Sequence, residues 1–83
     1  MKRRRDKLIQ LRKENGWLQK DIILLLKDRF EIEITESYYG MIEQGARTPK
    51  LDIALSIAKI FDVDPNEIFF DTEPNKNLGV ESA

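Results

Sequence analysis

The residue types that most often carry out enzyme chemistry are missing from this sequence or lack a partner in it. Its 83 residues include neither cysteine nor histidine, which removes thiolate nucleophiles, thiolate zinc sites, the commonest metal ligand and the usual general base. Ser37, Ser56 and Ser82 therefore have no histidine to activate them, and no phosphate-binding loop motif is present. We expect no enzyme activity, no cofactor and no metal site.

Charged side chains make up 35% of the chain and are unevenly distributed, although the formal net charge is only -1. Residues 1–13 carry seven basic side chains against one acid, whereas residues 62–83 carry six acids against one base. The N-terminal segment is expected to attract anions, and the acidic end to face elsewhere. A solvated first helix with a solubilising tail explains the same pattern, so charge placement alone leaves both readings open.

The elements that must position these side chains belong to one small domain. A chain of this length buries roughly 60% of its unfolded surface, enough for one core. We expect that core in residues 1–70, and an acidic, flexible tail in residues 71–83, which have little to bury. No apolar run approaches the roughly 20 residues that span a bilayer, and no signal peptide is recognisable, so the expected location is the cytoplasm.

Apolar spacing and capping residues predict an all-α fold, a compact bundle of about five short helices. The first three cover residues 2–15, 19–29 and 37–44, with Thr35 as the N-cap of the third and Gly45 as its stop. Leu18 occupies the N-cap position of the second helix, a loss of about 1 kcal/mol unless another group compensates. Residues 30–34 alternate apolar and charged side chains, which is also compatible with a short extended segment.

The last two helices are predicted from cap-proline pairs. Thr48 before Pro49 predicts the N-cap and first turn of a helix that runs to residue 61, and Asp64 before Pro65 predicts a short fifth helix. The fourth helix carries a second apolar stripe of isoleucines at positions 53, 57 and 60. A helix that is apolar around more than half of its surface either lies centrally or meets a partner.

Several motifs, in order, resemble those of the lambda-repressor-like, xenobiotic-response-element type of helix-turn-helix transcriptional regulators. They are Leu11-Arg12, Gly16, Gln19, Ile42-Glu43-Gln44-Gly45, Arg47, Pro49, Ala54, Ile57-Ala58 and residues 63–69. The resemblance covers about residues 7–70. It implies double-stranded DNA as the partner, residues 19–29 as the first helix of the motif, and residues 35–44 as a recognition helix that enters the major groove.

The resemblance also implies which side chains meet DNA. The base-contact candidates are Glu36, Ser37, Tyr38 and Met41, and the phosphate-contact candidates are Gln19, Gln44, Arg47, Thr48 and Lys50, with longer-range attraction from Arg3, Arg4 and Arg5. Glu36 is able to accept a hydrogen bond from a cytosine amino group, but complementing the helix dipole explains it equally well. In similar proteins the glutamine at position 19 bonds a phosphate or braces the recognition helix.

Arg12 and Glu43 are a separate case, because the family often pairs them to tie the first helix to the third. We expect a structural ion pair here rather than a DNA contact. Gly40 lies inside the third helix, where it costs about 1 kcal/mol relative to alanine. It predicts a close approach by a neighbouring helix or by a DNA backbone.

The chain departs from its resemblance in the turn of the motif, which is enlarged by about six residues relative to the usual short connection. Either the second helix runs on by a turn or more, or residues 27–33 form a looped insertion. In the second case Phe30 and Ile32 would pack the insertion onto Leu24 and Leu25.

The expected function is sequence-specific DNA binding by a transcriptional regulator, a repressor that acts as a homodimer on half-sites about 34 Å apart. The dimer interface would come from the isoleucine face of the fourth helix, from residues 68–70 or from the tail, and a weakly binding monomer is the other possibility. The alternative function is an antitoxin-like or phage-regulatory protein whose tail binds a protein partner while its helical domain regulates its own promoter.

Overall fold

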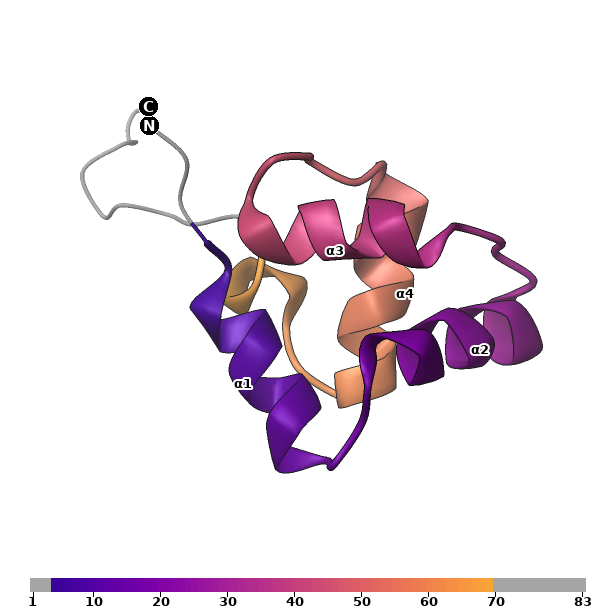
Figure 1. The fold of residues 1–83 in the computed structure, drawn as a ribbon, viewed down its shortest axis with the longest axis horizontal. Coiled ribbons are helices and arrows are strands. Elements are labelled where there is room, and N and C mark those ends of the chain that lie inside the picture. The colour runs from indigo at the N-terminus through magenta and orange to yellow at the C-terminus, as the bar shows by residue number, and fades with distance from the viewer. Residues whose placement is uncertain (1–3, 70–83) are drawn as a thin grey trace.

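Four α-helices and one 3-10 turn make up the computed structural model of the chain, which describes residues 4–69 (Figure 1). The helices are α1 (Asp6–Glu14), α2 (Gln19–Phe30), α3 (Glu36–Gln44) and α4 (Leu51–Phe61), and the 3-10 turn η1 covers Pro65–Glu67. The all-α prediction is confirmed for this part of the chain, with the fifth helix reduced to a 3-10 turn. Arg3 and the predicted tail, residues 71–83, lie outside the described residues.

The end of α1 and the start of α2 are set by residues that lie close to them in the sequence. α1 begins at Asp6, later than predicted, and the chain leaves it through Gly16, whose φ of 71° is in the left-handed region. Leu18 has no side-chain acceptor for the start of α2, but its own N–H donates to Asp21 Oδ2 over 2.7 Å. That bond is the reciprocal half of a capping box and compensates in part for the missing cap.

The enlarged turn is produced mainly by a longer α2. The helix continues to Phe30, and Glu31 ends it in the left-handed region with a φ of 57°. Residues 31–35 follow as an irregular connection rather than a strand, and Ile32 and Ile34 pack against the core. Leu24 is exposed, so the predicted role of Leu24 as a floor for an insertion is wrong.

The predicted start of the fourth helix is also wrong. α4 begins at Leu51 with Lys50 at its N-cap position, and Thr48 lies in the connection before it. Pro49 is buried, so it serves as an apolar anchor of that connection instead of the first helical residue. A cap-proline pair is a local signal, and burial of the proline overrides it here.

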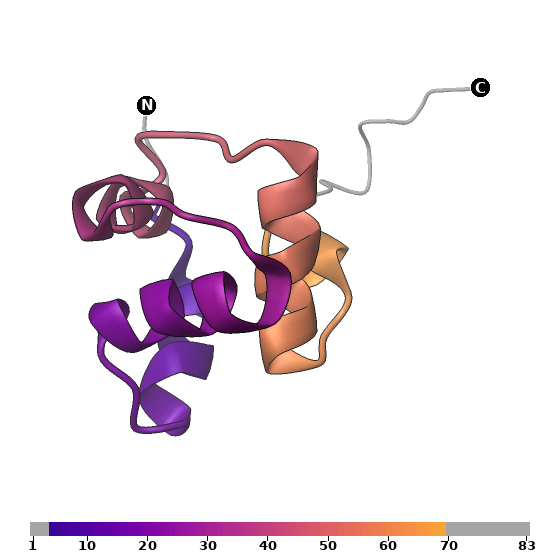
Figure 2. The ribbon, with the colours of Figure 1, turned by 90° about the vertical axis from the view of Figure 1, so that its right-hand side faces the viewer.

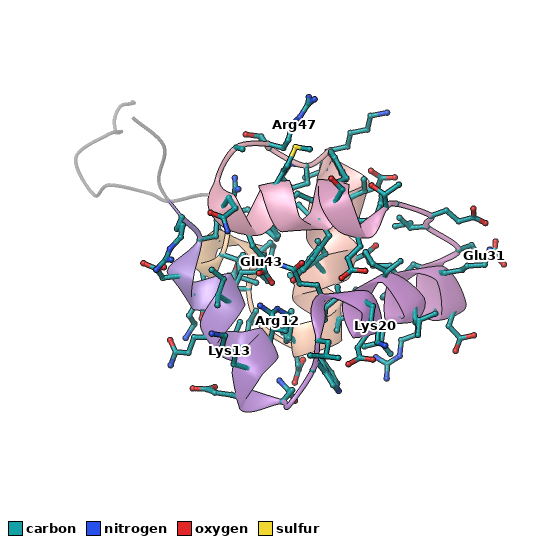
Figure 3. All side chains as sticks on the ribbon, viewed as in Figure 1. Arg12, Lys13, Lys20, Glu31, Glu43 and Arg47 are labelled. Carbon is teal, nitrogen blue, oxygen red and sulfur yellow. The ribbon has the colours of Figure 1, made fainter. Side chains whose placement is uncertain are left out.

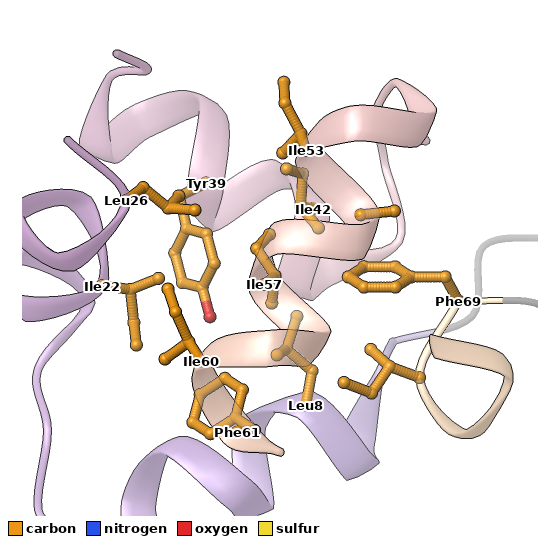
Figure 4. Packing of buried hydrophobic residues seen from close by; sticks show 12 residues of the cluster. Leu8, Ile22, Leu26, Tyr39, Ile42, Ile53, Ile57, Ile60, Phe61 and Phe69 are labelled. Atoms are coloured by element: carbon orange, nitrogen blue, oxygen red, sulfur yellow. The ribbon is translucent and has the colours of Figure 1, made fainter. Parts of the chain in front are cut away.

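The core gathers around α4, which every other element faces (Figure 4). Ile53, Ile57 and Ile60 are all buried, at 8%, 0% and 7% exposure. The second apolar stripe therefore packs against the other helices of the same chain, and the prediction that this stripe forms a dimer interface is wrong. Ile68 and Phe69 are buried as well, so these two residues are not exposed for the dimer interface that was also predicted at residues 68–70.

The arrangement leaves α3 on the outside. It lies across one side of the molecule above α1 and α2, and the segment from residue 45 to 50 passes from its end to α4 (Figures 1 and 2). Among residues 4–69, no helix is long and apolar enough to cross a membrane.

Candidate nucleic-acid interface

α3 has one buried face and one exposed face. Tyr39, Ile42 and Glu43 are buried, whereas Glu36 and Ser37 are exposed and Met41 is 37% exposed. The fourth base-contact candidate, Tyr38, is half-buried and packs at the edge of the core. The outward face therefore presents a carboxylate, a hydroxyl and a thioether from the first turn onward.

The ends of α3 are fixed by capping bonds. Thr35 Oγ1 accepts a hydrogen bond from the Tyr38 N–H over 3.0 Å. Gly45, with a φ of 79°, ends the helix, and its N–H donates to the Ile42 carbonyl. Because a side chain already satisfies one amide of the first turn, the helix start is defined without any ligand.

A buried ion pair holds α3 against α1, between the two helices in Figure 3. Arg12 donates from Nε to Glu43 Oε2 over 2.6 Å and from Nη2 to Glu43 Oε1 over 3.1 Å. Glu43 is 1% exposed, and the bond to it raises the pKa of Arg12, against the opposing effect of burial. The structure thus places this pair inside the fold, away from the exposed face of α3.

Gln19 acts on the same carboxylate. Its Nε2 donates to Glu43 Oε1 over 2.9 Å, so its amide nitrogen braces the recognition helix. A Cβ built on Gly40 would meet Gln19 Oε1 at 3.5 Å, an ordinary contact distance. The neighbour of Gly40 is therefore the side chain of Gln19, which an added methyl group would touch without a clash, and the close helix approach predicted from this glycine is wrong.

The phosphate-contact candidates Gln44, Arg47, Thr48 and Lys50 are all exposed, at the end of α3 and on the connection after it. In Figure 3 the Arg47 side chain points away from the helices on the side where α3 lies. The backbone N–H groups of Ala46 and Arg47 donate to the Met41 carbonyl over 2.9 and 3.3 Å. Side chains, not these amides, are thus available to a phosphate.

The N-terminal cations are partly used inside the molecule. Arg4 pairs with Asp6 over 3.1 Å at the surface, and Arg12 pairs with Glu43. Arg5 is half-buried, and burial lowers the pKa of its guanidinium. Its contacts with the end of α3 were missed from the sequence, because they join residues 37 and 42 positions apart. Within residues 4–13, the arginines are therefore a weaker source of free positive charge than the composition suggests.

A further buried polar group in the described part of the chain is the phenol of Tyr39. Tyr39 is fully buried, and its hydroxyl has no hydrogen-bond partner among the described residues. Burial, reinforced by the nearby Glu43 carboxylate, raises the pKa of this phenol, so it stays protonated. Within residues 4–69, no group of three or more acidic side chains is placed to hold a metal ion.

Comparison with known proteins agrees with this geometry. A family model described as helix-turn-helix matches residues 8–68, which include α2, its connection to α3, and α3 itself. Searches of curated proteins and of solved structures gave no match. The matched residues are most of the chain, and it therefore belongs to the lambda-repressor-like, xenobiotic-response-element type of helix-turn-helix family, whose members bind DNA sequence-specifically and regulate transcription.

Proposed function

We propose that the protein is a transcriptional repressor that inserts the first turns of α3 into the major groove of its operator. The observation that carries this proposal is the division of α3 into a buried face and an exposed polar face. Glu36, Ser37 and Met41 face the bases, with Tyr38 at the edge of the contact. An α-helix fits the major groove, and a good base contact gives about 1 to 3 kcal/mol of discrimination.

The phosphate contacts come from the segment that follows α3. Arg47 and Lys50 supply positive charge there, and Gln44 and Thr48 supply neutral polar groups. Gln19 braces α3 through the bond from its Nε2 to Glu43, and the second N–H of the same amide is the donor for a phosphate. Arg4, beside the start of α1, adds longer-range attraction.

The protein acts as a homodimer on two half-sites about 34 Å apart, since proteins with this motif bind such sites with matching two-fold symmetry. With the isoleucine face covered, the exposed apolar surface of α4 consists of Leu51 and Leu55, at 63% and 42% exposure. These residues are one helical turn apart and lie on the same face. They are the described residues of α4 best suited to contact a second copy.

Selection of bound duplexes from a random pool, followed by titration at several salt concentrations, tests the proposal. Glu36→Ala should change the preferred base at one position of the site. Arg47→Ala should weaken binding to all duplexes alike and flatten the salt dependence of log K by about one unit. Lys13→Ala is the matched control, because Lys13 is exposed at the end of α1 far from α3 (Figure 3).

The two substitutions must behave differently for the assignment to stand. Equal losses on every duplex, with no change of preferred base for Glu36→Ala, would show that α3 does not read the site through this residue. A flattening of the salt dependence by Lys13→Ala equal to that of Arg47→Ala would place the phosphate contacts elsewhere.

A further inference from the structure

Arg5, the residue just before α1, makes an unusual set of contacts with the end of the recognition helix. Its backbone N–H donates to the Glu43 carbonyl over 2.8 Å. Its Nη1 donates to the Ile42 carbonyl over 2.7 Å and to the Arg47 carbonyl over 3.1 Å. One residue thus bonds two carbonyls of the last turn of α3 and one carbonyl of the connection beyond it.

These contacts answer a specific need of α3. The last carbonyls of a helix lack intrahelical partners, and the C-terminal end carries a partial negative charge. α3 has no basic residue in its own last turn. The local N–H groups of Gly45, Ala46 and Arg47 already donate to the Ile42 and Met41 carbonyls. Arg5 adds, from another part of the chain, the donor to the Glu43 carbonyl, a second donor to the Ile42 carbonyl and the positive charge that the last turn lacks.

The guanidinium of Arg5 also contacts an aromatic ring. Its Cζ lies 5.4 Å from the ring centroid of Phe69, which is itself buried. That distance is within the range of a cation–π interaction. A planar guanidinium able to stack on a ring while bonding two carbonyls is not reproduced by a lysine ammonium.

We propose that Arg5 is a positioning residue for DNA binding, which holds the connection after α3 so that the Arg47 side chain reaches a phosphate. The link is direct, because the same Nη1 bonds both the last turn of α3 and the carbonyl of Arg47. The inference rests on the proposed function, in which Arg47 grips the phosphate. It replaces the expectation that Arg5 itself attracts the DNA backbone.

A double-mutant cycle in the full chain tests this role. Affinity for the selected duplex and its salt dependence are measured for wild type, Arg5→Ala, Arg47→Ala and the double variant. If Arg5 positions Arg47, each single substitution should lower affinity about tenfold and flatten the salt dependence by about one unit. The double variant should then show the same flattening as either single variant, because both remove one phosphate contact.

Arg4→Ala is the control, since Arg4 is the neighbouring cation and is exposed; its coupling to Arg47→Ala should be absent. If Arg5→Ala fails to fold, as judged by circular dichroism and urea unfolding, Arg5→Lys takes its place in the cycle. Lysine keeps the charge, so a residue acting only as a phosphate charge would be rescued by it. A positioning residue would not be fully rescued.

The outcomes separate this inference from the proposed function. Flattening by about two units in the double variant would make Arg5 an independent phosphate contact and overturn the inference alone. An unchanged affinity for Arg5→Ala would reduce Arg5 to a contact that only stabilises the fold. An unchanged salt dependence for Arg47→Ala would refute the phosphate assignment of Arg47, and with it the role of Arg5 in positioning it.

Discussion

Charged side chains in this protein are either buried or exposed, and this difference decides how much stability is lost when their partner is removed. The carboxylate of Glu43 is buried and accepts hydrogen bonds from Arg12 and Gln19. The carboxylate of Asp6 is exposed and pairs with Arg4 in solvent. A buried charge that loses its partner is left without solvation, whereas an exposed one is solvated by water.

Arg12→Ala should therefore lower the free energy of unfolding by about 3 to 5 kcal/mol, because Glu43 would remain as an uncompensated buried charge. Arg4→Ala should lower it by no more than about 1 kcal/mol. Urea unfolding followed by circular dichroism measures both. DNA binding by the Arg12→Ala protein should be lost in proportion to the unfolded fraction, and a folded variant unable to bind DNA would contradict the structural role assigned to the pair.

The sequence predicted the partners of this ion pair but not the contacts of Arg5. Arg12 and Glu43 belong to motifs of a known family, so their pairing was implied by the resemblance. The position of Arg5 depends on how the chain before α1 meets the end of α3, and no local pattern encodes a contact between residues so far apart. The missing basic residue in the last turn of α3 was the one available signal.

At the scale of elements, Gly40 shows how a helix keeps a residue that its own propensity disfavours. An alanine side chain at this position would meet Gln19 at an ordinary contact distance, and the backbone is helical. Gly40→Ala should thus raise the free energy of unfolding by about 0.5 to 1 kcal/mol. Affinity for the selected duplex should stay the same, because Gly40 faces α2.

Gly16→Ala provides the contrast, since nothing lies within 4 Å of its added Cβ but its φ is 71°. It should lower stability by about 1 to 2 kcal/mol through the backbone alone. Thermal or urea unfolding of the two variants measures the change in stability at each glycine. It therefore compares the effect of an added Cβ contact at Gly40 with the effect of a positive φ at Gly16. A loss of DNA binding by a stabilised Gly40→Ala protein would show that the glycine is kept for a close approach of DNA.

Helix boundaries were predictable where a cap acts locally and not where packing decides. Thr35 and Gly45 bound α3 as expected, because each makes its capping bond within the same segment. Thr48 and Pro49 carried the same kind of signal, yet Pro49 is buried within the connection from α3 to α4, and the helix begins two residues later, at Leu51. The fifth helix shrank to η1, which ends just before Ile68 and Phe69 enter the core.

For the molecule as a whole, the sequence predicted which positions of α4 are apolar better than it predicted which of its sides are exposed. Its periodicity correctly marked α4 as apolar on two sides, but periodicity does not tell a central helix from one that meets a second chain. In the structure the isoleucine side is enclosed by the other helices. On α4 the side with Leu51 and Leu55 remains exposed, and the dimer proposed above uses this face.

Leu51→Gln together with Leu55→Gln should convert the dimer to a monomer while leaving net charge and helix propensity almost unchanged. Sedimentation equilibrium measures the mass. Affinity for a duplex with two half-sites should fall by about 10²-fold, because the second contact is no longer made from the same assembly, whereas affinity for one half-site should stay constant. Leu24→Gln is the matched control, as Leu24 is equally exposed on α2, at 62%. If the α4 variant kept its dimeric mass, the interface would have to lie on another surface, and the exposed leucines of α4 would be ordinary surface residues.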